Sequence, residues 1–217
     1  MRENGRTGEE GKERAMKKGL RGLACLLALA VLLLALPTGA SAETWTADIS
    51  GSSGTITNGS AVLRVGQDDY IWWYLNITGV DASSGPLGDL VIPSSIGSYN
   101  MYTISSGAFQ NNDTLTSITL SNTTIVSIQA RAFKNCANLV RADLSECTMT
   151  AVNQELFKGC TSLETVILPS SIEVIYWEAF SGCTSLNTIY ILSEDVIDLD
   201  NADAFAGCPG NKLSRTF

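Results

Sequence analysis

Residues 163–186 read LETVILPSSIEVIYWEAFSGCTSL, and the spacing of the apolar residues in this stretch recurs along most of the chain. The phenylalanine in this stretch belongs to a series of five with intervals of 24, 24, 23 and 25 residues. A fixed period of this length is the signature of a repeat architecture. The series, called the Phe ladder below, comprises Phe109, Phe133, Phe157, Phe180 and Phe205.

Two further positions keep the same register. Three residues after each Phe stands Asn112 in the first copy and a cysteine in the other four. Six residues after each of the first four Phe stands a leucine. No single copy can bury these side chains alone, so the copies are expected to stack on one another. The cysteines are Cys136, Cys160, Cys183 and Cys208, and the leucines are Leu115, Leu139, Leu163 and Leu186.

Each of these leucines opens a pattern L-x-x-L-x-L in which buried and polar positions alternate. The alternation predicts a short strand with one side turned toward a core. A small polar residue such as Ser171 follows at the corner, where it can satisfy backbone groups. A second apolar pair, for example Ile172 and Ile175, predicts a second extended segment. A short helical turn carrying the Phe is expected to complete the repeat.

The stretches LVIPSSIGSYNMYTISSGAF (90–109) and LETVILPSSIEVIYWEAFSGCTSL (163–186) resemble the BspA-type leucine-rich repeats of bacterial surface proteins. The resemblance covers about residues 87–208. It implies a secreted or surface-displayed module, often linked to adhesion or to binding of host proteins, and it implies no catalytic residues. For residues 87–217 we therefore predict a right-handed leucine-rich-repeat solenoid with parallel strands, short helical turns and about five repeats of 23–28 residues.

Residues 1–42 have the pattern of a secretory signal peptide. A basic region ending at Arg21 precedes an apolar run of 14 residues at 23–36, and Ala40-Ser41-Ala42 forms an A-x-A cleavage site. The run is shorter than the roughly 20 residues that a spanning helix needs, which disfavours an uncleaved membrane anchor. We expect cleavage near Ala42, with translation starting either at Met1 or at Met16. No membrane span is expected in the mature chain, residues 43–217.

Residues 43–86 differ from the repeats and are predicted to form an N-terminal β cap. Residues 61–65 and 70–78 are expected to be two strands of a hairpin around the turn at 66–69. A solenoid needs such a cap because its first repeat would otherwise expose an apolar face. The aromatic cluster Tyr70-Ile71-Trp72-Trp73-Tyr74 could instead stack on sugars. We favour the cap, since alternation in a strand turns half of these rings toward the core.

Composition excludes several classes of function. The mature chain carries 7 basic and 18 acidic residues, a net charge of −11 that repels phosphate backbones and makes nucleic acid a poor partner. The chain has no histidine, which excludes His-based triads and His-based acid–base catalysis. The acidic residues from Glu194 to Asp203 lack the glycine and terminal glutamate of an EF-hand, so solvated charge is favoured over calcium binding. We expect no enzyme, no cofactor and no metal.

The repeated cysteine position is predicted to hold small buried side chains. Export favours disulfides. However, Asn112 fills the same position in the first copy, which indicates a packing site, and free Cys packs as a small hydrophobe. Buried free thiols are therefore favoured, with a disulfide between neighbouring copies as the alternative. Without histidine or a C-x-x-C pair, zinc-ligand spacing is absent.

The exposed positions of the strands are predicted to align in columns across the sheet. The column Thr119, Asp143, Ile167 and Tyr190 combines charged, branched and aromatic side chains, as in a weak recognition stripe. The alternative is an ordinary solvated sheet face. With Arg141 and Glu164 from adjacent columns, these are the candidate ligand-binding residues of a module for protein–protein interaction or adhesion. The ligand would be an extracellular protein or a glycan, and a carbohydrate-binding or purely structural surface protein is the alternative. The adjacent columns are Thr116, Val140, Glu164, Asn187, and Ser117, Arg141, Thr165, Thr188.

Overall fold

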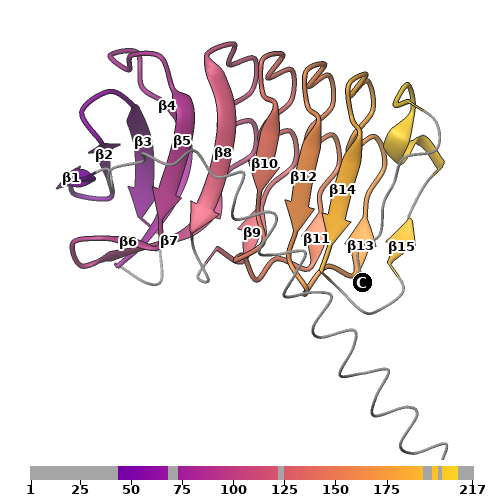
Figure 1. Ribbon diagram of the computed structural model, residues 1–217. Helices are drawn as coiled ribbons and strands as arrows, with labels where there is room; N and C mark the ends of the chain where they lie inside the picture. Colours follow the sequence, from indigo (N-terminus) through magenta and orange to yellow (C-terminus); the bar gives the residue numbers. More distant parts are fainter. Residues whose placement is uncertain (1–43, 68–72, 122–124, 193–196, 200–201, 210–217) are drawn as a thin grey trace, which may run out of the picture. The chain divides into compact units, whose positions relative to one another are not determined.

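A computed structural model describes residues 44–209, apart from 68–72, 122–124, 193–196 and 200–201. Two rows of parallel strands enclose one apolar core and are closed at the N-terminal end by an antiparallel sheet (Figure 1). The expected signal peptide at 1–42, the rings of Tyr70 and Trp72, and Glu194 lie outside the described residues.

The first row is a five-stranded parallel sheet to which each repeat contributes one strand. The order β14-β12-β10-β8-β5 reverses the sequence order, so consecutive repeats are always neighbours. Ala142 of β10 pairs with Ile118 of β8 and with Val166 of β12, so equivalent positions of successive repeats stand side by side. The strands are β5 (Gly88–Pro93), β8 (Leu115–Ser121), β10 (Arg141–Asp143), β12 (Thr165–Leu168) and β14 (Thr188–Ile191).

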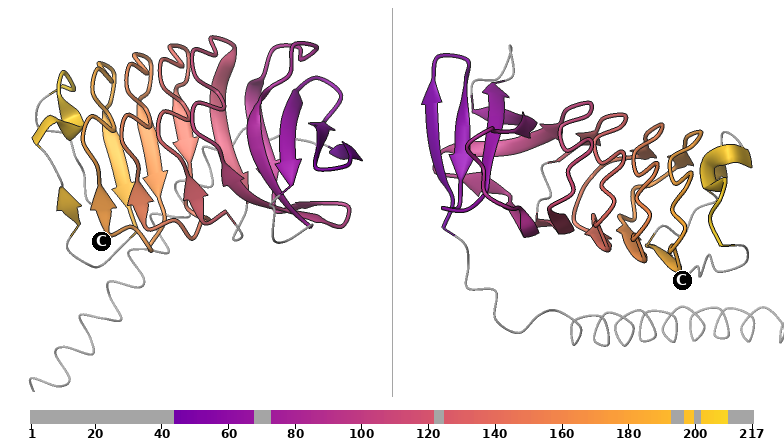
Figure 2. Two further views of the ribbon diagram at one scale, coloured as in Figure 1. Left: turned by 180° about the vertical axis from the view of Figure 1, so that it is seen from behind. Right: turned by 90° about the horizontal axis from the view of Figure 1, so that it is seen from above.

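The second extended segment of each repeat forms the other row, which is seen from behind in Figure 2. Strand β7 pairs with β9, and β11 pairs with β13, which pairs with β15, in parallel in every case. The hydroxyl of Ser171 donates to the carbonyl of Met149 at 2.7 Å, as expected for the corner position. The strands are β7 (Tyr99–Ile104), β9 (Ser127–Ile128), β11 (Ala151–Val152), β13 (Val174–Ile175) and β15 (Asp198–Leu199).

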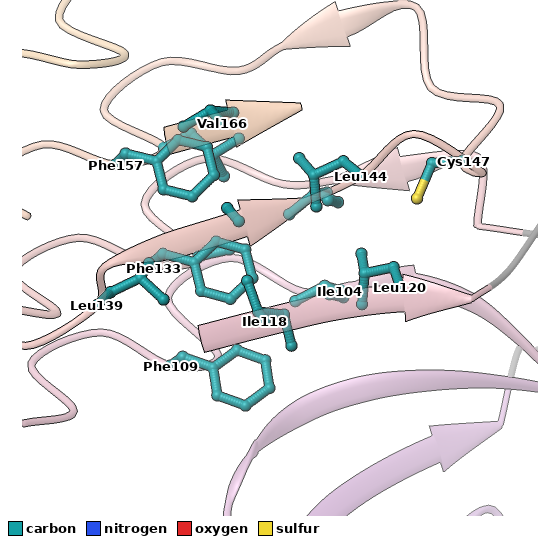
Figure 3. Packing of buried hydrophobic residues seen from close by; sticks show 14 of the residues in the cluster. Ile104, Phe109, Ile118, Leu120, Phe133, Leu139, Leu144, Cys147, Phe157 and Val166 are labelled. Atoms are coloured by element: carbon teal, nitrogen blue, oxygen red, sulfur yellow. The ribbon is translucent and has the colours of Figure 1, made fainter. Parts of the chain in front are cut away.

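The core between the two rows contains the Phe ladder (Figure 3). Neighbouring rings are stacked with centroids 5.3 to 5.5 Å apart and planes within 12° of parallel. The first four rings are almost fully buried, and the leucines and cysteines of residues 115–186 that share their register are buried with them. The predicted leucine-rich-repeat solenoid of about five repeats is confirmed.

The short helical turns predicted at each Phe are tighter than α-helical turns. Around Phe133 they are successive i→i+3 turns, with amides of Ala132, Lys134 and Cys136 donating three residues back. Positive φ angles of 63° at Arg131 and 59° at Asn135, two residues before and after the Phe, interrupt any helix. In the part of the chain that the structure describes, only the fifth copy forms a 3₁₀ helix, η1 (Ala202–Phe205).

The N-terminal end is closed by four antiparallel strands, of which the sequence predicted two. Strands β3 (Val62–Gln67) and β4 (Tyr74–Val80) form the expected antiparallel pair, although β4 begins later than predicted. Strands β1 (Thr46–Ser50) and β2 (Ser53–Thr57) extend that sheet outward.

Strand β4 connects the N-terminal antiparallel sheet to the solenoid. It pairs in parallel with β7, and β7 also pairs in antiparallel fashion with the short strand β6 (Ser95–Ile96). The indole Nε1 of Trp45 donates to the carbonyl of Val91 on β5 at 3.1 Å, so Trp45 ties the N-terminal residues to the first strand of the five-stranded sheet.

Candidate ligand-binding face

The columns predicted on the outer side of the five-stranded sheet are present in its register. Thr119, Asp143, Ile167 and Tyr190 pair in sequence across β8, β10, β12 and β14, and Val91 of β5 extends the column. We call these columns together the strand face. A second column consists of Asp89, Ser117, Arg141, Thr165 and Thr188. A third column consists of Thr116, Val140, Glu164 and Asn187, which are joined by backbone hydrogen bonds.

One predicted member of the strand face is not available to a ligand. Ile167 is 2% exposed, although it is not part of the apolar core cluster. Asp143 on one side and the bulky Tyr190 on the other occupy the neighbouring register positions, where Cβ atoms lie about 5 Å away. Ile167 therefore serves as apolar support for its neighbours, and its prediction as a contact residue was wrong. Tyr190, Asp143 and Thr119 remain partly exposed.

The polar groups of the strand face are partly engaged with one another. The Arg141 guanidinium lies 3.1 Å from an Asp143 oxygen, and the hydroxyl of Ser145 donates to the same carboxylate at 2.7 Å. Asp89 accepts from the hydroxyls of Thr116 and Ser117, both at 2.8 Å. Glu164 is exposed, and no ion pair with it occurs in the described part of the chain.

A row of ion pairs along the Phe turns was missed by the sequence reasoning. Glu155, 5% exposed, is bound by the guanidinium of Arg131 at 3.1 Å and by the ammonium of Lys134. These hydrogen bonds lower the pKa of Glu155 to about 2. One repeat further on, Lys158 pairs with Glu178 at 2.7 Å. Lys directly after one Phe and Glu two residues before the next was the available signal.

The cysteine position has a clear structural role. The thiols of Cys136, Cys160, Cys183 and Cys208 each donate to the carbonyl of the Phe in the preceding repeat, at 3.0 to 3.1 Å. These four and Cys147 are free thiols, as favoured from the sequence. Burial raises the pKa of Cys183 and of Cys147 to about 12. Neutral thiols at these positions are poor nucleophiles and poor metal ligands.

Of the aromatic residues in the cluster at 70–74, the structure describes Trp73 and Tyr74, and neither of these two rings is fully buried. Trp73 is 57% exposed, because β4 begins only after it. Tyr74 lies on the outer side of β4 and stacks on Tyr102 of β7, with ring centroids 4.7 Å apart. The exposed ring of Trp73 and the partly exposed pair Tyr74–Tyr102 form a second candidate surface, at the N-terminal antiparallel sheet.

Comparison with protein-family models identifies the family of the repeats. Residues 84–212 match the model described as "BspA type Leucine rich repeat region", in six copies. The chain belongs to the BspA-type leucine-rich repeat family. Repeats of this kind occur in bacterial surface proteins and form protein-interaction modules. Within the described residues of this BspA-type chain, there is no cluster of three or more His, Cys, Asp or Glu residues that could hold a metal ion.

The chain also has similarity to several solved structures. A leucine-rich repeat protein from Bacteroides ovatus has a TM-score of 0.56 and 23% identity, covering 77% of this chain and 40% of that one. A leucine-rich repeat protein from Eubacterium ventriosum has a TM-score of 0.42 and 17% identity, and the match covers 73% of this chain and 52% of that one. The pneumococcal vaccine antigen PcpA has a TM-score of 0.39 and 16% identity, and the match covers 73% of this chain and 43% of that one. This chain thus spans less than half of the Bacteroides ovatus protein.

No curated protein matched the chain in a separate comparison. A search of the described residues for helices long and apolar enough to cross a membrane found none.

Proposed function

We propose that the chain is a secreted or cell-surface binding module without catalytic activity, and that it binds a protein partner through the strand face. The observation that carries the proposal is the register of the five-stranded sheet. It aligns Arg141, Glu164 and Tyr190 beside hydroxyl side chains on one continuous surface. Charged, hydroxyl and aromatic groups on a rigid repeat scaffold are what an adaptable recognition surface requires.

Export is part of the proposal and is supported by the pattern of residues 1–42. The basic region, the short apolar run and the A-x-A sequence predict cleavage after Ala42. Membership of a family found in bacterial surface proteins agrees with that destination. N-terminal sequencing of the protein recovered from medium, wall and membrane fractions tests this directly. Mature protein that begins at Glu43 outside the cytoplasm is expected, whereas uncleaved cytoplasmic protein would contradict it.

Binding through the strand face is tested by two double variants of matched composition. Glu164→Ala/Tyr190→Ala removes a carboxylate and a phenol from the strand face. Glu173→Ala/Tyr176→Ala removes the same groups beside β13, on the opposite row. Both are compared with the unmodified residues 43–217 on a panel of immobilised extracellular matrix proteins. We expect only the strand-face variant to lose binding. Equal loss in both variants, or loss only in the second, would contradict the proposal.

Carbohydrate binding at the cap is the second candidate, and the exposed ring of Trp73 favours it. Flat exposed aromatic rings beside polar groups suit sugar recognition, and the hydroxyl of Thr103 donates to Asn76 at 2.7 Å near the Tyr74–Tyr102 pair. A glycan array probed with residues 43–217 and with Trp73→Ala tests it. Glycan binding that Trp73→Ala abolishes and Glu164→Ala/Tyr190→Ala leaves unchanged would establish this site.

A further inference from the structure

We infer that the partner of the strand face is a cationic protein segment that lies in an extended conformation across the repeats. This inference rests on the proposed function and specifies the chemistry of its ligand.

The first argument is that the positive charges of the solenoid are already neutralised. The described residues include five lysines and arginines. Arg131 and Lys134 are bound to Glu155, and Lys158 is bound to Glu178. Arg141 is bound to Asp143 within the strand face itself. Arg64, the fifth, lies on β3 of the N-terminal antiparallel sheet, outside the strand face. An anionic partner would therefore have to compete with an internal carboxylate for nearly every cation that the described surface offers.

The second argument is that the strand face has carboxylates in excess. It contains Asp89, Asp143 and Glu164 against the single cation of Arg141. Asp89 is exposed, and its described contacts are hydroxyl groups, which do not neutralise it. Glu164 is exposed between Val140, itself 40% exposed, and Asn187. The mature chain carries a net charge of −11, so the long-range field of the whole chain attracts the same kind of partner.

The third argument concerns geometry. Asp89 is on β5 and Glu164 immediately precedes β12, so three strand spacings separate them, about 14 Å at ~4.8 Å per strand. An extended peptide that crosses the strands advances ~3.3 Å per residue, so side chains four residues apart span the same distance. Lysines or arginines at positions i and i+4 would then face the two carboxylates. Val140, 40% exposed, immediately precedes β10 and would contact the residues between the two cations. Tyr190 is on β14, one strand beyond Glu164, and would contact the residues that follow the second cation.

The test uses a defined peptide and the mature protein. The probe is a 12-residue peptide with Lys at every fourth position and Thr or Val elsewhere, and its control has Glu in place of Lys. Binding is measured by calorimetry at about 0.15 M salt, where the Debye length is about 8 Å. The Lys peptide is expected to bind and the Glu peptide is not. Glu164→Lys is expected to raise the Kd about tenfold or more, because it places like charges together.

The matched control is Glu173→Lys, which changes the net charge equally on the opposite row of strands. We expect it to change the Kd less than about twofold, since exposed charges more than a Debye length apart are largely screened. Equal weakening by Glu164→Lys and Glu173→Lys would show that only the net charge matters, and would overturn the inference. Failure of the Lys peptide to bind would also overturn it.

The proposed function is judged separately, by the double variants on matrix proteins. If Glu164→Ala/Tyr190→Ala abolishes binding of a matrix protein whose contacting segment is neutral or acidic, the strand face is the binding surface and the cationic partner is wrong. If that double variant binds like its matched control, the proposed function itself fails.

Discussion

Replacing Phe157 by alanine removes the central ring of the Phe ladder and is expected to destabilise the whole solenoid. The ring is fully buried and stacks on Phe133 at 5.4 Å and on Phe180 at 5.5 Å. Truncation of a buried Phe costs about 3–5 kcal/mol through lost burial and the cavity left behind. Each stacked neighbour accounts for about 0.5–1.5 kcal/mol of aromatic contact. We therefore expect the free energy of unfolding to fall by about 3–5 kcal/mol.

Two control variants separate burial from stacking. Phe157→Leu retains most of the apolar volume and loses the ring contacts, so a cost of about 1–2 kcal/mol is expected. Phe205→Ala removes a ring that is only partly buried and, among the described residues, stacks on Phe180 alone, so it should cost less than half as much as Phe157→Ala.

Urea denaturation followed by circular dichroism measures all three variants against unmodified residues 43–217. For a unit of this size, 3–5 kcal/mol corresponds to a fall in Tm of about 6–20 °C. A fall of less than about 1 kcal/mol for Phe157→Ala would refute the assignment of the ladder to the core. Equal costs for Phe157→Ala and Phe205→Ala would refute the argument that stacked neighbours on both sides determine the magnitude.

Three further outcomes follow from the structure. Glu155 has a folded-state pKa of about 2 against an ordinary 4.5, so its ion pairs stabilise the fold above pH 4.5 and the gain is lost as pH falls toward 2. Glu155→Gln should lower the free energy of unfolding by about 2 kcal/mol at neutral pH, measured by urea denaturation. It should also reduce the loss of stability between pH 4.5 and pH 2, and an unchanged pH profile would contradict this. Gly159 has a φ of 75°, so Gly159→Ala should cost about 1–2 kcal/mol, whereas Gly159→Asn should cost less because Asn135 adopts φ 59° at the same repeat position. A larger cost for Asn than for Ala in denaturation curves would refute that explanation. In a thiol titration without reductant, residues 43–217 should show five reactive thiols when unfolded and at most the partly buried Cys208 when native; fewer than five on unfolding would indicate a disulfide.

The solenoid and its columns could be predicted because one spacing determines both. A period of about 24 residues places equivalent positions side by side, so the register of Arg141 with Thr165 follows from the sequence alone. The position of the Cys thiols followed for the same reason. Their hydrogen bonds to Phe carbonyls did not, because backbone direction inside the turn is set by the positive φ angles on either side of each of the first four Phe.

Other features depended on contacts that a repeat pattern does not contain. The burial of Ile167 arises from the size of its neighbours on adjacent strands, so the alternation of exposed and buried positions misassigned it. Strands β1 and β2 have few apolar residues and were not recognised. Their two-residue connection, Gly51-Ser52 with Gly51 at φ 66°, is a hairpin signal that was available. The outward direction of Trp73 required knowing where β4 begins.

The central claim, that the strand face is the surface that binds, is tested most directly by hydroxyl-radical footprinting of tyrosines. Tyr190 lies on the strand face and Tyr176 lies beside β13 on the opposite row, and both are partly exposed. Oxidation of each is compared with and without a saturating bound partner, which can be the Lys peptide or a matrix protein captured in the panel. We predict that the partner protects Tyr190 and leaves Tyr176 unchanged. Protection of Tyr176 with continued oxidation of Tyr190 would contradict the claim.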